Sequence, residues 1–263
     1  MRIARLTIAL FLLLAINATA FAERKDPLDD KPARLPRVQL RDTRFEIGPS
    51  IQFSVDRALR HAFLFGLRAQ YHINDYFSLG ADVGFGVGVD TGLKGEIESQ
   101  KVPASLGGGD DWSAIMNNIA DIQMAGDVRA TFTPFSGKMA VFGKAFFAYD
   151  FYVFAGFGFA MTKNNSDIPG VDEANEGFRP GFAWGAGLQM FFTDWFSTGI
   201  EIRDLLFSDN ESGGDLTRGQ SDTELAQSAV LIDGDDKELT HHFFLGVNFT
   251  FFFPLTPSVS MTY

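Results

Sequence analysis

Bulky apolar residues alternate with small or polar residues along eight stretches of the chain. The clearest stretch runs from Phe77 to Asp90, with apolar side chains or alanine at odd positions and glycine, serine or aspartate at even ones. Because a β-strand turns successive side chains to opposite faces, this stretch has one apolar face and one narrow polar face. The pattern predicts strands at residues 43–55, 62–73, 76–90, 121–133, 144–161, 178–192, 195–207 and 240–253.

The connections between these strands alternate in length. Residues 74–75 and 193–194 are tight turns and 134–143 a moderate one, whereas 91–120, 162–177 and 208–239 are long and polar; the short 56–61 connection breaks the rule. Strands that exceed roughly 9 to 11 residues can cross a membrane, with short turns in the periplasm and long loops outside. The pattern therefore predicts an all-β fold, an eight-stranded antiparallel up-and-down transmembrane β-barrel.

The first 22 residues have the features of an export signal. Arg2 and Arg5 precede a short apolar run, and Ala20 and Ala22 stand at small-residue spacing, so cleavage is expected after Ala22 or, alternatively, after Ala20. We expect a signal peptide at 1–22, a periplasmic segment at 23–41, a barrel at 42–253 and a C-terminal tail at 254–263, in the outer membrane of a Gram-negative cell.

Alternation alone does not say which face of each strand lies inside the barrel. A soluble lipocalin-like barrel would place the bulky residues within and the polar faces in water. Those faces carry mainly glycine and alanine, as at Gly84, Gly86 and Gly88, where a water-exposed sheet would carry lysine, glutamate or threonine. Small residues instead fit the interior of an eight-stranded barrel, so the bulky faces should meet lipid.

Charged residues fall on the predicted inner faces in nearly equal numbers of each sign. Unpaired charge in such a narrow lumen would cost several kcal/mol per ion, so we expect salt bridges that plug the barrel. The alternative is a proton or ion path along the same residues. The ten predicted lumen charges are Arg44, Glu46, Arg68, Asp82, Asp127, Arg129, Lys144, Asp150, Glu201 and Arg203.

A short internal repeat supports the predicted turns, because the sequence of residues 72–80 resembles that of residues 191–199. Both segments place aromatic residues directly after a tight turn, where a membrane barrel has its interfacial girdle. The predicted interfacial aromatics are Tyr76, Phe77, Trp195 and Phe196.

The formal charge of −11 argues against nucleic acid as a partner, because phosphates need a basic surface. The absence of cysteine decides nothing about the compartment. Loss of residues 1–22 would remove two arginines and no acid, and the charge would become −13.

Two groups of residues could carry chemistry. His61, His241 and His242 fall near the outer rim with Asp56 close by, which allows a catalytic or metal-binding cluster or, as the alternative, ordinary boundary histidines. The last long loop is rich in carboxylates that could bind calcium, densest at residues 233–236, or could remain a solvated acidic loop. We expect no catalytic residue, metal site or cofactor.

A set of motifs lies at residues 23–33, 37–41, 44–49, 71–76, 134–138, 150–152 and 155–156. Together these motifs resemble outer-membrane β-barrel domain proteins of myxobacteria and related bacteria, and more distantly OmpA-like eight-stranded barrels. The resemblance implies the fold and the membrane but no activity. Barrels of this kind usually end on an aromatic residue of the last strand, whereas here residues 254–263 follow, with Tyr263 last.

Two functions remain open at this point. A structural or surface-interaction barrel is preferred, a porin-like conduit for small solutes or ions is the alternative, and an enzyme is a distant third. The expected partners are outer-membrane lipid, lipopolysaccharide and the barrel insertion machinery, with any protein partner at the surface or in the periplasm unknown.

Overall fold

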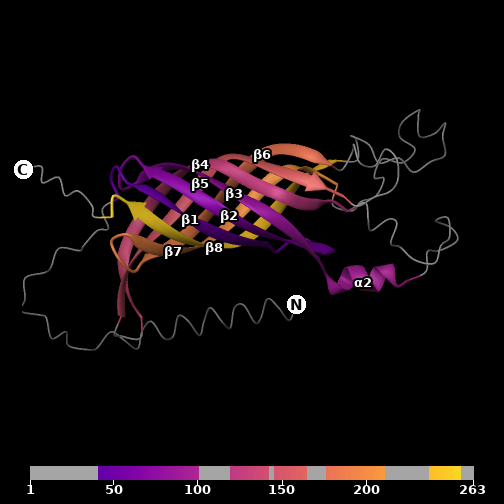
Figure 1. Ribbon diagram of the computed structural model, residues 1–263, viewed down its shortest axis with the longest axis horizontal. Coiled ribbons are helices and arrows are strands. Elements are labelled where there is room, and N and C mark those ends of the chain that lie inside the picture. The colour runs from indigo at the N-terminus through magenta and orange to yellow at the C-terminus, as the bar shows by residue number, and fades with distance from the viewer. Residues whose placement is uncertain (1–40, 101–118, 142–144, 165–175, 211–236, 256–263) are drawn as a thin grey trace, which may run out of the picture. The chain divides into compact units, whose positions relative to one another are not determined.

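The computed structural model describes residues 41–100, 119–141, 145–164, 176–210 and 237–255, which form a closed barrel of eight antiparallel strands (Figure 1). Each strand pairs with its neighbours in the chain, and β1 also pairs with β8, which closes the ring. The predicted all-β, up-and-down architecture is confirmed. The strands are β1 (Phe45–Ser54), β2 (Arg60–His72), β3 (Phe77–Asp90), β4 (Asp121–Val141), β5 (Ala145–Lys163), β6 (Gly177–Phe191), β7 (Phe196–Asp209) and β8 (Glu238–Phe253).

The two ends of the barrel differ in their connections. At one end, which we call the turn end, Asn74 Oδ1 accepts hydrogen bonds from the backbone N–H groups of Tyr76 and Phe77, each at 2.8 Å. The equivalent turn between β6 and β7 uses Thr193 Oγ1 in the same way. Short polar side chains stabilise tight turns by such local bonds. The opposite end, which we call the loop end, carries the connections from β1 to β2, β3 to β4, β5 to β6 and β7 to β8.

The moderate turn predicted at residues 134–143 is wrong, because β4 continues to Val141. A register shift lies between Phe132 and Phe135 on β4, and it contains Pro134, which has no N–H to donate to a neighbouring strand. Beyond it, residues 135–141 pair with β5 but not with β3. The two strands therefore extend past the rest of the barrel at the turn end (Figure 1).

A short helix, α2 (Gly92–Glu98), follows β3 at the loop end. Thr91 caps it by accepting a hydrogen bond from the backbone N–H of Lys94 at 3.3 Å. Within the described ranges, no helix has the length and apolar character needed to cross a membrane.

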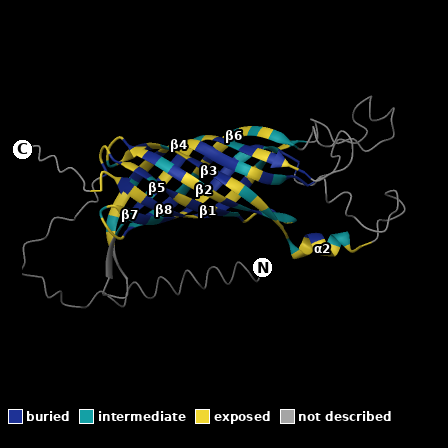
Figure 2. Ribbon diagram, in the orientation of Figure 1, coloured by how far each residue is buried: buried dark blue, intermediate teal, exposed yellow. Residues whose placement is uncertain are grey.

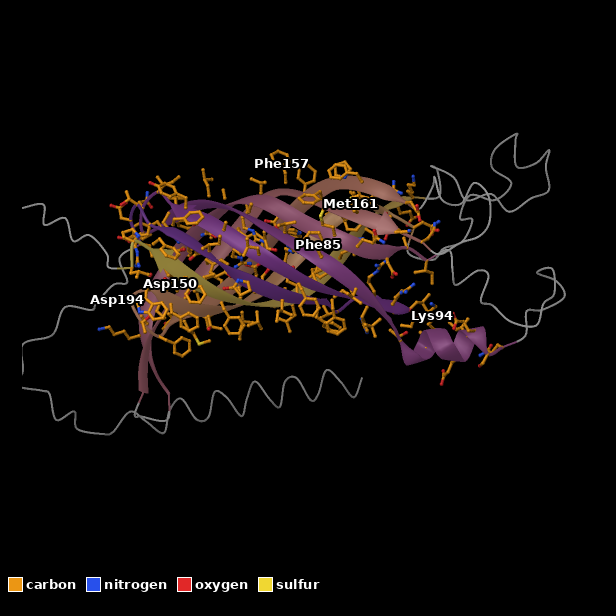
Figure 3. All side chains as sticks on the ribbon, viewed as in Figure 1. Phe85, Lys94, Asp150, Phe157, Met161 and Asp194 are labelled. Carbon is orange, nitrogen blue, oxygen red and sulfur yellow. The ribbon has the colours of Figure 1, made fainter. Side chains whose placement is uncertain are left out.

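Burial alternates residue by residue along the strands (Figure 2). On β8, Phe243, Leu245 and Val247 are exposed on the outside, whereas Phe244 and Phe252 are buried inside. Phe85 and Phe157 likewise project outward from β3 and β5 (Figure 3). The glycine-rich faces line the interior, which agrees with the facing predicted from the sequence.

Candidate functional site: the barrel lumen

Six charged side chains meet in the middle of the lumen, and all six are buried. They come from β2, β3, β4 and β7, each of which turns every second residue inward. We call them the central charge cluster: Arg68, Asp82, Asp127, Arg129, Glu201 and Arg203. Their formal charges cancel within the group.

Glu201 receives two arginines from other strands. Arg68 Nη2 lies 2.6 Å from Glu201 Oε2, and Arg129 Nη1 lies 2.9 Å from each carboxylate oxygen. Tyr152 also donates its hydroxyl to Glu201 Oε2 at 2.9 Å. These charge-assisted hydrogen bonds offset the cost of removing the carboxylate from water.

Asp82 and Asp127 are directly opposite each other on β3 and β4. Their carboxylates would repel each other without counter-charges. Arg129 pairs with both oxygens of Asp127, and its Nη2 lies 2.6 Å from Oδ2. Arg203 Nη1 lies 3.0 Å from Asp127 Oδ2 and 3.5 Å from Asp82 Oδ1. Arg68 Nε lies 3.3 Å from Asp82 Oδ2. Each of the two aspartates is therefore shared by two arginines.

Aromatic rings cover two of the three arginines of this cluster. The guanidinium carbon of Arg129 lies 3.8 Å from the ring centroid of Phe154, and that of Arg203 lies 5.2 Å from that of Phe244. A cation over an aromatic face keeps a favourable electrostatic partner without admitting water. The cluster is thus enclosed by apolar surface as well as by opposite charge.

A second polar layer lies between the central charge cluster and the turn end. Glu46 Oε2 lies 3.3 Å from His72 Nε2 and accepts a hydrogen bond from Gln189 Nε2 at 3.2 Å. Gln189 Nε2 also lies within hydrogen-bond distance of the Ser197 and Thr250 hydroxyls, at 2.8 and 3.0 Å, so this layer connects β1, β2, β6, β7 and β8. All these side chains are buried.

Two arginines close the turn end itself. Arg41 Nη2 donates to the backbone oxygen of Asp75 at 2.6 Å, and its Nη1 lies 3.2 Å from Asp150 Oδ2. Arg44 donates to the backbone oxygens of Asp194 and Pro254 at 2.7 and 2.8 Å. These contacts join the start of the barrel to its turns.

The open space left between these layers is small. A cavity of about 10 Å³ is lined by Arg41, Glu46, Arg68, Gln70, Thr131, Thr133, Tyr152 and Gln189. A site needs at least about 10 to 15 Å³ to hold one water molecule. This part of the lumen is therefore close to filled by side chains.

An apolar layer lies on the loop-end side of the central charge cluster, and the sequence pattern did not indicate it. Leu64, Ile122, Leu205, Phe207 and Phe244 form a buried cluster there together with small alanines. At its outer edge, Arg57 Nη2 lies 3.3 Å from Asp209 Oδ2 and donates to the backbone oxygen of Ala120 at 3.1 Å. His242 stacks on Phe207 with ring centroids 4.0 Å apart. A hydrophobic layer thus separates the central charge cluster from the outside.

Of the ten residues predicted as lumen charges, six form the central charge cluster. Glu46, Asp150 and Arg44 lie in the layers nearer the turn end, and Lys144 is outside the described residues. Four further buried side chains were not predicted: Arg41 and Arg57, which precede and follow β1, and the uncharged partners Gln52 and Tyr152. The alternation along β1 and β5 could have placed Gln52 and Tyr152 inside the barrel. Arg41 and Arg57 lie outside the strands, so no alternation applies to them.

The three rim histidines do not converge. The His61 and Phe53 rings are tilted at 49° with centroids 4.9 Å apart. His242 points inward, and His241 Nδ1 lies 2.6 Å from Asp204 Oδ2 on the outer face. The Asp56 carboxylate accepts a hydrogen bond from the backbone N–H of Phe243. In the described part of the chain, no three or more His, Asp or Glu residues are grouped to hold a metal ion. Residues 233–236, the densest part of the predicted calcium site, lie outside that part.

The aromatics predicted for the membrane interface all lie at the turn end, one pair after the β2–β3 turn and the other after the β6–β7 turn. Tyr76, Phe77 and Trp195 are exposed, and Phe196 is half-buried. Trp195 stacks on Phe251 with ring centroids 6.1 Å apart. Their interfacial role remains a prediction.

A closed barrel with an apolar outer face and a polar, tightly packed interior defines a transmembrane β-barrel of the outer-membrane type. The model of the outer membrane protein beta-barrel domain matches residues 8–251, and the chain belongs to this family. The protein is located in the cell outer membrane. By the usual topology of such barrels, we expect the turn end to be periplasmic and the loop end extracellular.

Solved structures of low sequence identity are also similar. The N-terminal β-barrel domain of OprF from Pseudomonas aeruginosa is 14% identical, with 81% of this chain and 98% of that chain covered and a TM-score of 0.43. OprG from the same organism is 13% identical, with coverage of 82% and 99% and a TM-score of 0.41. Ail of Yersinia pestis, the attachment invasion locus protein, is 12% identical, with coverage of 80% and 97% and a TM-score of 0.34. No curated protein matches the chain.

Proposed function

We propose that the protein is a structural barrel of the outer membrane whose lumen is closed by its own side chains, and that its loop end serves surface interaction. The observation that carries this proposal is the central charge cluster, in which Asp82, Asp127 and Glu201 are each paired with two arginines. The apolar layer around Phe207 and Phe244 adds a second barrier. The lipids around the apolar outer face, lipopolysaccharide among them, and the insertion machinery are the partners that this role implies.

The proposal includes no catalytic role. A general acid or base needs a carboxylate or imidazole that can exchange a proton with substrate. The buried carboxylates of the central charge cluster are instead held by arginines and enclosed by aromatic rings.

Conductance of the purified protein in planar lipid bilayers tests the closed lumen. The expected result is no stepwise ion current from the wild type, because moving an ion through would require several buried pairs to separate in low dielectric. Ion-selective steps in the wild type, together with changed selectivity and unchanged stability in Arg203→Met, would overturn the proposal in favour of a conduit. Ile202→Met, an outward neighbour on β7, is the matched control.

A further inference from the structure

In the described part of the chain, one edge of β4 has no neighbouring strand at the turn end (Figure 1). β4 pairs with β3 as far as Phe132, and the Thr133 backbone N–H donates to the Tyr76 backbone oxygen at 2.8 Å. Residues 135–138 continue to pair with β5 but not with β3, because β3 only begins at Phe77. Unpaired strand edges recruit further strands, so folded proteins cover or blunt them.

The described part of the barrel sequence begins beside this open edge. The Arg41 backbone N–H donates to Asp75 Oδ1 at 2.7 Å, and Arg41 Nη2 donates to the Asp75 backbone oxygen at 2.6 Å. Asp75 directly precedes Tyr76, whose backbone oxygen is bonded to β4 at Thr133. The residues before Arg41 therefore join the barrel next to the point where β4 loses β3 as its neighbour.

The direction of the chain at this point suits an antiparallel strand. β4 runs from the loop end to the turn end, so residues 135–138 lead away from the ring. The residues before Arg41 lead toward the ring, because β1 follows them. A segment in line with β3 would therefore run antiparallel to β4, as β3 itself does. Because Arg41 already holds one end of this segment, such pairing is intramolecular and is favoured over pairing with a separate chain.

The sequence before Arg41 alternates in the way that a strand at this edge requires. Arg41 is buried and points inward, where its Nη1 lies 3.2 Å from Asp150 Oδ2 on β5 (Figure 3). Successive residues of a strand face opposite sides of the sheet. Counted back from Arg41, this alternation assigns Gln39 to the inner face and both Leu40 and Val38 to the outer face.

The two faces of β4 beyond the register shift match this assignment. On the outer face Phe135 is 66% exposed, and its ring centroid lies 6.4 Å from that of Phe151 on β5. On the inner face Ser136 lies opposite the buried Asp150. Apolar side chains of an added strand would therefore meet apolar neighbours, and Gln39 would meet polar ones.

We propose that residues 37–40, with the sequence Arg-Val-Gln-Leu, form a short strand on the open edge of β4, so that the N-terminal segment of the chain covers this edge. Leu40 lies on the outer face beside Phe135, and Gln39 faces inward. Pro36 limits the strand, because proline has no N–H to donate. The edge is thereby closed to other chains, and the segment before the barrel is fixed to it. This strand does not depend on the closed lumen.

Disulfide cross-linking tests both the pairing and the facing, because the chain has no cysteine of its own. Leu40→Cys is combined in turn with Phe135→Cys, Ser136→Cys, Gly137→Cys or Lys138→Cys, and the protein from outer membranes is oxidised in lipid vesicles. Opposite residues of an antiparallel pair have Cα atoms about 4.5 to 5.5 Å apart, within the range of a disulfide. We expect an intrachain disulfide at position 135 or 137, formed at least about tenfold faster than at 136 or 138, whose side chains face the other way.

Hydrogen exchange tests the same edge without introduced cysteines. Mass spectrometry of the peptide at residues 134–141 reports the backbone N–H groups that point away from β5. Gln39→Pro should speed their exchange by about tenfold or more, because proline lacks an N–H, constrains the residue before it and so disrupts the proposed strand. Leu28→Pro, in the same N-terminal segment but outside the proposed strand, is the matched control and should leave exchange unchanged.

The proposal stands only if the facing-dependent disulfide and the effect of Gln39→Pro are both observed, and the exchange comparison alone decides it if the cysteine variants do not fold. Disulfide-linked dimers of the single variant Phe135→Cys would place a second copy of the chain on the edge and overturn the proposal. Equal rates at all four positions would mean random collision of a tethered segment and would also overturn it. Slow exchange that survives Gln39→Pro would assign the cover to lipid or to another protein, with the same consequence.

Discussion

The arginines of the central charge cluster differ in how many carboxylates would lose a counter-charge if each arginine were replaced. Arg129 binds both oxygens of Asp127 and both of Glu201, so it joins two carboxylates that come from different sides of the lumen. Arg203 reaches Asp127 and Asp82 with a single nitrogen, and each of these aspartates keeps another arginine. Loss of the two arginines should therefore have unequal effects.

We expect Arg129→Met to lower the free energy of unfolding in lipid vesicles by about 3 to 5 kcal/mol, because it leaves buried carboxylates short of a counter-charge. Arg203→Met should cost less, about 1.5 to 3 kcal/mol, the range of hydrogen bonds to charged groups. Equilibrium urea unfolding measures both. Ile202→Met on the outer face should stay within about 0.5 kcal/mol. Equal and negligible losses at both arginines would contradict the pairing described above.

At this scale the sequence predicts which charges point inward but not which partners they meet. Parity along one strand is enough to place Glu201 inside, whereas its contacts with Arg68 and Arg129 depend on the tilt and closure of the whole barrel. The outward-facing Asp204 could have been predicted from the sequence but was not. Arg203 and Asp204 are adjacent charges on one strand, so one of them has to face lipid.

Among the elements, β3 gives the cleanest test of inward and outward faces. Val83→Arg places a charge on the lipid side near the middle of the strand and should cost about 2 to 4 kcal/mol. Gly86→Ala should also destabilise, for a different reason, because its new Cβ would lie 1.8 Å from the backbone oxygen of Ile122 on β4. Urea unfolding in vesicles measures both changes. A harmless arginine at position 83 would show that the faces are reversed.

The extension of β4 and β5 should contribute little to barrel stability. Its last three pairs, from Met139↔Phe147 to Val141↔Ala145, join only these two strands. Replacing residues 139–147 with a two-residue turn should therefore change the free energy of unfolding by less than about 1 kcal/mol, since an isolated hairpin is marginal in water. Shortening β6 and β7 by three pairs at their turn end, where β6 also pairs with β5 and β7 also pairs with β8, is the contrasting control. A large loss in the first variant would mean that the extension stabilises the ring.

Turn chemistry explains which connections the sequence could predict. Asn74 and Thr193 bond locally to the next residues, so the two tight turns can be identified without tertiary information. Residues 134–138 have turn-like composition, but pairing between β4 and β5 overrides it, and nothing local reports that pairing. The apolar layer around Leu64 and Phe207 was missed for a similar reason, because inward parity does not distinguish a packed core from a polar lumen.

The whole molecule should behave as an integral barrel of the outer membrane. Hydrogen bonds that close the ring resist detergent until heat opens it, so the protein should migrate differently in detergent gels before and after boiling. Fractionation of cells should place it with outer membranes. Recovery as a soluble periplasmic species would be incompatible with the exposed apolar rings on β3, β5 and β8.

The seam between β1 and β8 makes closure of the ring depend on pairing between the first and last strands of the chain. Phe45 pairs with Phe253, so the contact that seals the ring joins residues from opposite ends of the barrel sequence. Until β8 pairs with both of them, β1 and β7 each present an unpaired edge, and such edges recruit other chains. Contacts this distant in sequence also form slowly. Because the first and last strands must pair to close the ring, the sheet has open edges until the end of folding. During that time it can aggregate with other copies of the same chain.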